Sequence, residues 1–323
     1  MIYVSLPDEK TRRLVFYLAM EEYIAHKVDE KDCFFMWQVR PSVLFGRNQL
    51  IANEVNLDYC REKGIEIYRR KSGGGCIYAD MNNVMSSYIT KEDKVSISFS
   101  RFLNMVVDVL HRLNIPAEAS GRNDILIEGK KVSGNAFYHA AGKSILHGTM
   151  LFDTDMENIT NSLTPNTEKL SSKGVQSIRQ HIALLKDYTD IGIKEFKEFV
   201  KKHLCDEELT LTENDIREIE KIEKEYLSDE FIYGNNPSYN LVKRQRIEDV
   251  GIIEVHLELK NNIIKKINLL GDYFLVGDLD NDLLKRLQGA ELREDTLQNV
   301  VPADLNDVIM NLKKEDFIRL LLQ

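Results

Sequence analysis

Three consecutive glycines at positions 73–75 constrain the fold of this chain more than any other feature of its sequence. Residues 65–68 alternate between apolar and polar side chains, and residues 76–78 form a second extended segment, so the glycines predict a turn between two strands. Because glycine has no Cβ atom, such a turn can adopt positive φ angles and point several N–H groups into one anion-binding concavity. Arg69 and Arg70 add planar cations suited to carboxylate or phosphate. A tight hairpin with solvated arginines would produce the same pattern, so the turn alone does not decide a function.

Helical and strand patterns alternate along the rest of the chain. The spacing of apolar residues predicts helices and strands in mixed order, with helices near 8–26, 99–113, 157–163, 193–204 and 213–227 and strands near 33–39, 43–45, 124–127, 131–133 and 147–152. After a turn-forming cluster at 234–237, residues 252–259 and 263–270 predict a β-hairpin followed by helices. A chain of 323 residues exceeds the usual size of one domain. We therefore expect an α/β fold with a mixed sheet over residues 1–247 and a small α+β domain over residues 248–323.

Charge and cysteine content exclude several classes of protein. A net charge of −9 and a pI near 5.4 argue against a protein that neutralises many nucleic-acid phosphates. The four cysteines show no metal-ligand spacing and no disulfide framework, which fits a reducing compartment. No segment reads as a signal peptide or a membrane span. The sequence predicts a cytoplasmic protein that binds neither nucleic acid nor membrane.

A second polar motif lies on the predicted hairpin over residues 124–133. Asn123, Asp124 and Lys131 bring an amide, a carboxylate and an ammonium group close together, which suits a nucleotide and Mg²⁺. A lysine on a strand can also stabilise negative charge that develops at a reacting phosphate. In isolation, either Lys130 or Lys131 is more readily interpreted as an ordinary turn lysine on a solvated hairpin. A P-loop is excluded, because the glycine that it requires five positions before Gly142 is Phe137.

Together these motifs resemble those of lipoate-protein ligases, and the resemblance extends over nearly the whole chain. Their order and spacing carry it, in the segments 43–49 with Asn56, 69–75, 121–124, 131–134, 147–149 and 172–179. The resemblance implies a catalytic domain of the biotin and lipoate ligase type with a mixed sheet covered by helices. It also implies a small C-terminal accessory domain.

The resemblance further implies a role for individual residues. Lys131 would be the catalytic lysine, and residues 164–179 would close over the adenylate. Contacts to lipoate or lipoyl-AMP would come from Arg70, Ser72, Gly73, Gly74, Gly75, Cys76, Ile77, Tyr78, Lys131, Ser133, Gly134, His147, Gly148 and Thr149. Contacts to ATP would come from Arg70, Gly75, Cys76, Ile77, Tyr78, Asn83, Asn123, Asp124, Lys131 and Lys173, with Asp124 also holding Mg²⁺.

The implied reaction has two steps. The enzyme would use ATP and Mg²⁺ to convert lipoate into lipoyl-AMP, and would then transfer the lipoyl group to a lysine of an apo lipoyl carrier domain. By the same resemblance, the carriers would be acyltransferase subunits of 2-oxoacid dehydrogenases and the glycine-cleavage H protein. We expect a monomer.

Departures from the family pattern keep alternatives open. The chain has Ala79 and Asn82 where the family usually has histidine and glycine, and His181 and Leu184 where it usually has arginine and asparagine. A carrier-binding or lipoate-sensing relative without catalysis would fit Ala79 and Asn82. An ATP-independent lipoyl or octanoyl transferase of the same fold would instead carry the acyl group on a reactive Cys76. A biotin ligase fits less well, because its activation loop usually reads Gly-Arg-Gly-Arg-Arg-Gly.

Overall fold

The structure, a computed structural model, describes residues 1–28, 31–49, 51–91, 94–120, 123–163, 181–233, 241–260 and 262–323. The chain divides into two compact units. The first comprises residues 1–44, 52–70 and 77–232, and the second comprises residues 45–51, 71–76 and 233–323. The second unit therefore includes two short segments from the N-terminal part of the sequence.

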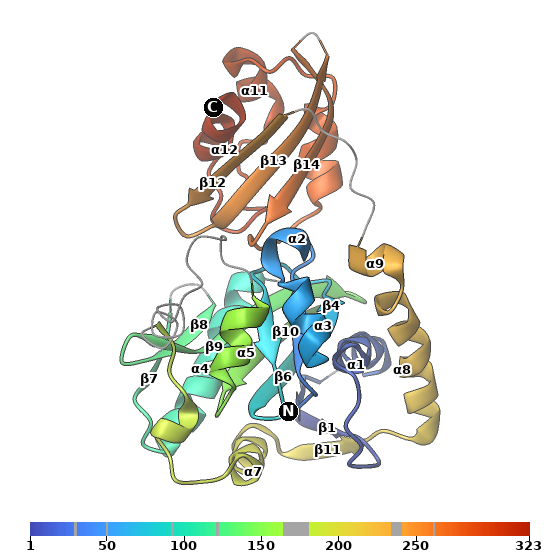
Figure 1. The fold of residues 1–323 in the computed structure, drawn as a ribbon, viewed down its shortest axis with the longest axis vertical. Coiled ribbons are helices and arrows are strands. Elements are labelled where there is room, and N and C mark those ends of the chain that lie inside the picture. Colours follow the sequence, from blue (N-terminus) through green and yellow to red (C-terminus); the bar gives the residue numbers. More distant parts are fainter. Residues whose placement is uncertain are drawn as a thin grey trace. The chain divides into compact units, whose positions relative to one another are not determined.

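An eight-stranded mixed sheet forms the centre of the first unit (Figure 1). Strands β1, β2 and β11 are parallel neighbours, and the pairs from β2 to β6 and onward are antiparallel. In spatial order the strands are β11 (Glu207–Thr210), β1 (Ile2–Ser5), β2 (Cys33–Trp37), β6 (Asn83–Thr90), β10 (Lys143–Leu151), β9 (Lys130–Ala140), β8 (Asp124–Ile127) and β7 (Ala117–Ala119). The expected mixed α/β architecture is confirmed.

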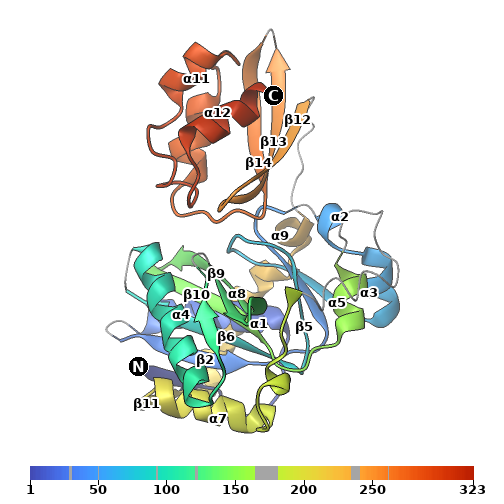
Figure 2. The same cartoon turned by 90° about the vertical axis from the view of Figure 1, so that its left-hand side faces the viewer.

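Helices cover both faces of this sheet (Figure 2). One face packs against α1 (Leu14–Lys27) and the other against α4 (Val95–Arg112). All residues of β2 are buried, which is why its sequence is continuously apolar instead of alternating. On the α1 side Trp37 stacks on Tyr17, and on the α4 side Tyr88 stacks on Phe102. Among the described residues, the other α-helices of the first unit are α3 (Leu57–Lys63), α5 (Met156–Ser162), α7 (Ile193–Leu204), α8 (Glu213–Tyr226) and α9 (Asp229–Tyr233), and α2 (Ile51–Glu54) begins at the border with the second unit.

The strands on either side of the glycine turn do not form a hairpin with each other. Strand β4 (Glu66–Arg69) and strand β5 (Ile77–Ala79) belong to a three-stranded sheet in which β3 (Ser42–Phe45) lies between them. The reading of this region as a tight hairpin is therefore wrong. The turn must span the width of an intervening strand, which requires a longer and more irregular connection than a two-residue turn.

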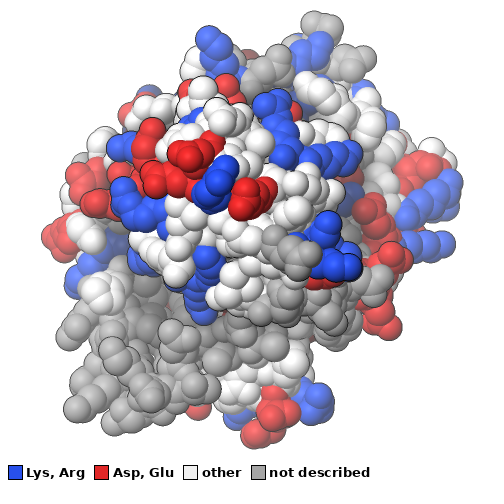
Figure 3. Space-filling view, turned by 90° about the horizontal axis from the view of Figure 1, so that it is seen from above, with Lys and Arg blue, Asp and Glu red and all other residues white. Residues whose placement is uncertain are grey.

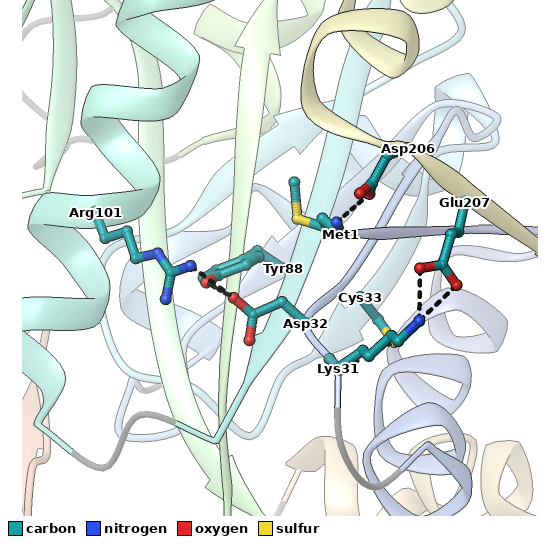
Figure 4. A network of polar contacts seen from close by, with 8 residues as sticks. All are labelled: Met1, Lys31, Asp32, Cys33, Tyr88, Arg101, Asp206 and Glu207. Atoms are coloured by element: carbon teal, nitrogen blue, oxygen red, sulfur yellow. Dashed lines mark hydrogen bonds and ion pairs between the residues drawn. The ribbon is translucent and has the colours of Figure 1, made fainter.

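Polar contacts surround the edge of the large sheet where β1 and β11 pair (Figure 4). The Lys31 ammonium donates to both carboxylate oxygens of Glu207, at 2.5 and 2.7 Å. The Tyr88 hydroxyl donates to Asp32 at 2.6 Å, and Arg101 pairs with the same carboxylate at 3.3 Å. Such part-exposed pairs contribute little stability individually, because water screens their charges. The face of the molecule in Figure 3 likewise carries basic and acidic side chains intermixed.

The second unit contains a three-stranded antiparallel sheet with helices on one face (Figure 1). Burial alternates along its central strand, where Ile253, Val255 and Leu257 face a core that also holds Leu287 and Phe317. In the part of this unit that the structure describes, the strands of the sheet are β12 (Leu241–Ile247), β13 (Gly251–Lys260) and β14 (Ile263–Gly271), and the helices are η2 (Asp280–Leu284), α10 (Lys285–Leu287), α11 (Glu294–Val300) and α12 (Lys314–Leu322). The expected C-terminal α+β domain is present. Among the described residues, every helix is too short or too polar to span a bilayer.

Candidate active site

The hairpin of β8 and β9 contains a β-bulge next to Lys131. Ile125 pairs with Ser133, but the next residue, Leu126, pairs with Lys131, so Val132 is an extra residue in β9. A bulge interrupts the regular alternation of side chains and re-aims the residues beside it. The sequence predicted the hairpin but gave no signal for the bulge, which sets the direction of the Lys131 side chain.

The re-aimed Lys131 side chain lies against Gly134 and forms an ion pair with Asp124. Its Nζ atom is 2.9 Å from Asp124 Oδ1, and the two side chains are 43% and 27% exposed. A Cβ atom on Gly134 would lie 2.7 Å from both Cε and Nζ of Lys131. The bare backbone at Gly134 therefore provides the space that the lysine occupies. An ammonium group held in this way stays accessible to an anionic ligand.

Other predicted residues gather around this ion pair on β8, β9 and β10. Thr149 is the register partner of Gly134, and its Oγ1 accepts a 3.4 Å hydrogen bond from the Gly134 N–H. Asn123 precedes β8 and donates from its side chain to the Asn135 carbonyl at 2.7 Å. Ser133 is buried in β9, and Gly148 is the register partner of Asn135. The structure thus brings together Lys131, Asp124, Asn123, Ser133, Gly134, Gly148 and Thr149.

The predicted adenylate-covering segment, residues 164–179 with Lys173, lies outside the described residues. The described residues on either side of it are held by backbone contacts. On one side, the Ser162 carbonyl accepts from the Asn56 N–H at 2.9 Å. On the other side, Ile182 forms a parallel bridge with Lys131, and the Ala183 N–H donates to the Lys131 carbonyl at 2.9 Å. The chain therefore re-enters the described fold on the backbone of the predicted catalytic lysine.

Arg70 and Arg69 hold main-chain carbonyls of the first unit. Arg70 is 4% exposed, and its Nη1 donates to the Leu44 carbonyl at 2.9 Å. The Nε of Arg69 donates to the Ile232 carbonyl at 2.9 Å, and burial lowers the pKa of Arg69 to about 10. Leu44, Arg70 and Ile232 are each the last residue of the first unit before the chain crosses to the second. The two arginines thus hold the main chain at Leu44 and Ile232, where it passes from the first unit to the second, in addition to any role toward a ligand.

The rest of the glycine-rich segment, Ser72 to Cys76, belongs to the second unit and packs on its backbone. The Ser72 carbonyl accepts from the Arg47 N–H at 2.9 Å, and the Gly74 N–H donates to the Tyr273 carbonyl at 3.3 Å. Gly74 has a φ of +87°, which is the conformation that the sequence predicted for this turn. Gly73 is needed for a different reason, since its Cβ would lie 2.4 Å from the Tyr273 carbonyl oxygen.

Two alanine substitutions test whether the packing of Gly73 on Tyr273 stabilises the second unit. We expect Gly73→Ala to destabilise the second unit by about 1–3 kcal/mol, because the obstructing atom is backbone and cannot rotate away. Gly75→Ala is the matched control, since nothing lies within 4 Å of the added Cβ, and its effect should stay within about 0.5 kcal/mol. Urea denaturation would measure both. Equal midpoints for the two variants would contradict the packing of Gly73 on Tyr273.

Tyr78 and Asn83, both predicted to contact ATP, lie beside a buried carboxylate. The Asn83 side chain is fully buried, its Nδ2 donates to Thr154 Oγ1 at 3.0 Å, and its Oδ1 has no hydrogen-bond partner among the described residues. Burial raises the pKa of the neighbouring Asp80, and this rise is opposed by hydrogen bonds that include the Asn82 N–H at 2.9 Å. A buried acceptor without a partner is costly, and a ligand donor would satisfy it.

His147 participates in a buried polar network. Its Nδ1 lies 2.9 Å from Glu21 Oε2, and Glu21 also accepts from the hydroxyls of Ser87 at 2.5 Å and Tyr138 at 3.2 Å. Glu21 is fully buried on α1 and was not identified from the sequence, because its position in a helical pattern gave no sign of this network. The network connects α1 to β6, β9 and β10.

Metal-ligating side chains and cysteine thiols are the other groups that could carry chemistry. Among the described residues, no group of three or more His, Cys, Asp or Glu side chains could hold a metal ion. Burial raises the thiol pKa of Cys33 and Cys60 to about 11 and that of Cys205 to about 12, so these thiols are protonated at neutral pH. Cys76 is only partly buried and is the cysteine on which a thioester route would depend.

Comparison with known proteins gives concordant matches. The chain matches a model of the lipoyl protein ligase A/B catalytic domain over residues 14–205 and one of the bacterial lipoate protein ligase C-terminus over residues 236–321. It is 35% identical over 317 residues to a lipoate-protein ligase of Bacillus subtilis (strain 168), covering 94% of this chain and 95% of that protein.

Two solved structures share the fold. A P. falciparum protein solved in complex with lipoate superposes with a TM-score of 0.77 at 19% identity, covering 100% of this chain and 98% of the other. A lipoate-protein ligase A bound with ATP superposes with a TM-score of 0.62 at 24% identity, covering 72% of this chain and 98% of the other.

Proposed function

Because this chain belongs to the lipoyl protein ligase A/B family and is a lipoate-protein ligase, we propose that it activates lipoate with ATP and transfers the lipoyl group from lipoyl-AMP to a carrier lysine. The observation that carries the proposal is the Lys131 ammonium, held by Asp124 and Gly134 and still 43% exposed. Activation of a carboxylate by a nucleotide requires a preorganised cation at such a position.

In the first step, a lipoate carboxylate oxygen forms a bond to the α-phosphorus of ATP, and the bond from that phosphorus to the bridging oxygen breaks to release pyrophosphate. Lys131 would hold the carboxylate against the phosphate and stabilise the negative charge that develops there. Asn123, which precedes β8, and Thr149 on β10 would border the phosphates from the two sides of β9. The lipoate bound in one of the two superposed structures and the ATP bound in the other support this pairing of substrates.

Mg²⁺ would be held by Asp124 together with the phosphates of ATP. Mg²⁺ commonly uses one or two carboxylates and keeps its remaining ligands as water or phosphate oxygen, so the single part-exposed carboxylate of Asp124 fits it. When bound, the ion would neutralise charge on the leaving pyrophosphate.

In the second step, the neutral ε-amine of the carrier lysine attacks the acyl carbon, AMP leaves with the electrons of the anhydride bond, and the amine loses a proton to solvent. The family name states that the acceptor is a protein, and we propose lipoyl domains of 2-oxoacid dehydrogenases and the glycine-cleavage H protein as carriers. Residues 1–247 as the catalytic domain, residues 248–323 as the accessory domain, a monomeric state and a cytoplasmic location stay predictions.

The test is to incubate the purified protein with lipoate, ATP, Mg²⁺ and a panel of apo carriers, measuring pyrophosphate and the intact mass of each carrier. We expect stoichiometric pyrophosphate and a lipoyl mass increase on one or more carriers. If the wild type transfers acyl groups without pyrophosphate and Cys76→Ala abolishes transfer, the enzyme is instead a thiol-dependent transferase. Binding of lipoate or carrier without turnover would indicate the non-catalytic relative.

A further inference from the structure

Asn135 of β9 has a buried side chain that contacts the residue before β8 and a serine on its own strand. Its side chain is 4% exposed, and Nδ2 donates to the Asn123 carbonyl at 2.9 Å and to Ser133 Oγ at 3.1 Å. The main chain repeats the connection, because the Asn135 N–H donates to the same Asn123 carbonyl at 3.1 Å and the Asn135 carbonyl accepts from Asn123 Nδ2 at 2.7 Å. Four hydrogen bonds therefore converge on Asn135, three of them shared with Asn123.

The opposite side of the Asn135 side chain rests on Gly148 of β10. A Cβ atom on Gly148 would lie 1.9 Å from Asn135 Oδ1 and 2.8 Å from its Cγ. The amide of Asn135 thus fills the volume that a side chain at position 148 would take. It is confined between two strands and cannot rotate without losing its hydrogen bonds.

The residue that follows Asn123 is Asp124, the ion-pair partner of Lys131. Asp124 is the register partner of Gly134, over which the lysine side chain lies. The Asp124 N–H also donates to Ser120 Oγ at 2.9 Å. Any shift of the Asn123–Asp124 peptide therefore moves the carboxylate relative to the Lys131 ammonium.

We infer that Asn135 is a positioning residue for acyl activation: its side-chain amide fixes the Asn123–Asp124 peptide and, through Asp124, the place of Lys131 Nζ. This inference rests on the proposed function. Asn135 touches neither reacting group, so it acts through the ion pair. It should matter in the first step, in which Lys131 stabilises charge, and not in attack on an adenylate that is already formed.

The main variants are Asn135→Ala, which removes the amide, and Asn135→Asp, which keeps the shape but replaces the donor by an acceptor facing the Asn123 carbonyl. We expect each to lower kcat for lipoate-dependent pyrophosphate release by about tenfold or more, since small misplacements of catalytic groups have effects of this size or larger. Transfer from chemically prepared lipoyl-AMP should fall less than about threefold. Ser42→Ala, which removes the hydrogen bond that another buried side chain donates to a main-chain carbonyl, that of Arg40, is the matched control and should affect both steps alike.

Two combined variants separate positioning from simple destabilisation. In an Asp124→Asn background, adding Asn135→Ala should lower activation much less than it does in the wild type, because both changes act on one ion pair. Gly148→Ala should be strongly destabilising alone and less so with Asn135→Ala, because the clashing amide is gone. Equal losses in both half-reactions, or full additivity with Asp124→Asn, would overturn the inference while leaving the proposed function intact. A wild type that releases no pyrophosphate would instead overturn the proposed function, whatever the outcome of the Gly148 cycle.

Discussion

Lys131→Ala is expected to lower lipoate-dependent pyrophosphate release by about 10² or more, with little change in thermal stability. The stabilising charge would be lost from the transition state, and loss of a preorganised group of this kind typically has such an effect. Stability should change little because the side chain is 43% exposed and its ion pair with Asp124 is only partly shielded from water. Pyrophosphate release and a thermal melt would be measured on the same preparation.

Lys130→Ala is the matched control for this prediction. Lys130 is the preceding residue of the same strand, has the same charge and is exposed, and its register partner on β8 is Ile127 instead of Asp124. We expect its activity to stay within about twofold of wild type, as for most exposed substitutions. Near-normal pyrophosphate release by Lys131→Ala, or equal losses in the two variants, would remove Lys131 from the catalytic role.

Gly134→Ala should also abolish most activation, on the order of 10²-fold, while the protein stays folded. The added methyl group would occupy the space of Lys131 Cε and Nζ, each 2.7 Å from the new Cβ. Those atoms are the flexible end of a side chain, so the lysine can swing away at small cost to stability. Its ammonium would then be displaced by an ångström or more, which is sufficient for a loss of this size.

The control for Gly134→Ala is Gly192→Ala, at the N-cap of α7, where nothing lies within 4 Å of an added Cβ and φ is −76°. Both variants should show melting temperatures close to wild type, and only Gly134→Ala should lose activation. If Gly134→Ala is fully active, the lysine does not need the space above residue 134. If it is unfolded, the clash is structural and does not act through Lys131.

Local patterns predicted much of the fold, and long-range pairing accounts for what they missed. The helix predicted over residues 193–204 has the same bounds as α7 in the structure. Its apolar residues recur at helical spacing and its other residues are polar, so the pattern is visible within the segment itself. Strand β6 was not predicted, although it is central to the sheet. Its sequence mixes Ser86 and Ser87 with apolar residues, and Ser87 is tolerated inside only because Glu21 and Trp37 hydrogen-bond to it. Strands β1 and β11 pair across about two hundred residues, which no window of sequence can reveal.

In the candidate site, too, local motifs were predicted and long-range contacts were missed. Lys131, Asp124 and Gly134 were identified by motif, and their proximity follows from one hairpin. The bulge at Val132 was not predicted, because no residue type in this segment marks a bulge. The role of the Asn135 amide was not predicted either, because a buried asparagine is recognised only from the strands that enclose it. Glu21 escaped notice for the same reason, since the donors around it come from three separate strands.

The second unit is assembled from three stretches of sequence, and this affects how such proteins can be recombined. Asn48 accepts from the Gly271 N–H at 2.8 Å, and Gly73 and Gly74 rest on Tyr273. A chimaera that imports only residues 233–323 from another ligase would place a foreign backbone under loops 45–51 and 71–76, which had adapted to the original one. Modules of this protein therefore have to be exchanged as a set of three segments, and family members are expected to vary in those segments together.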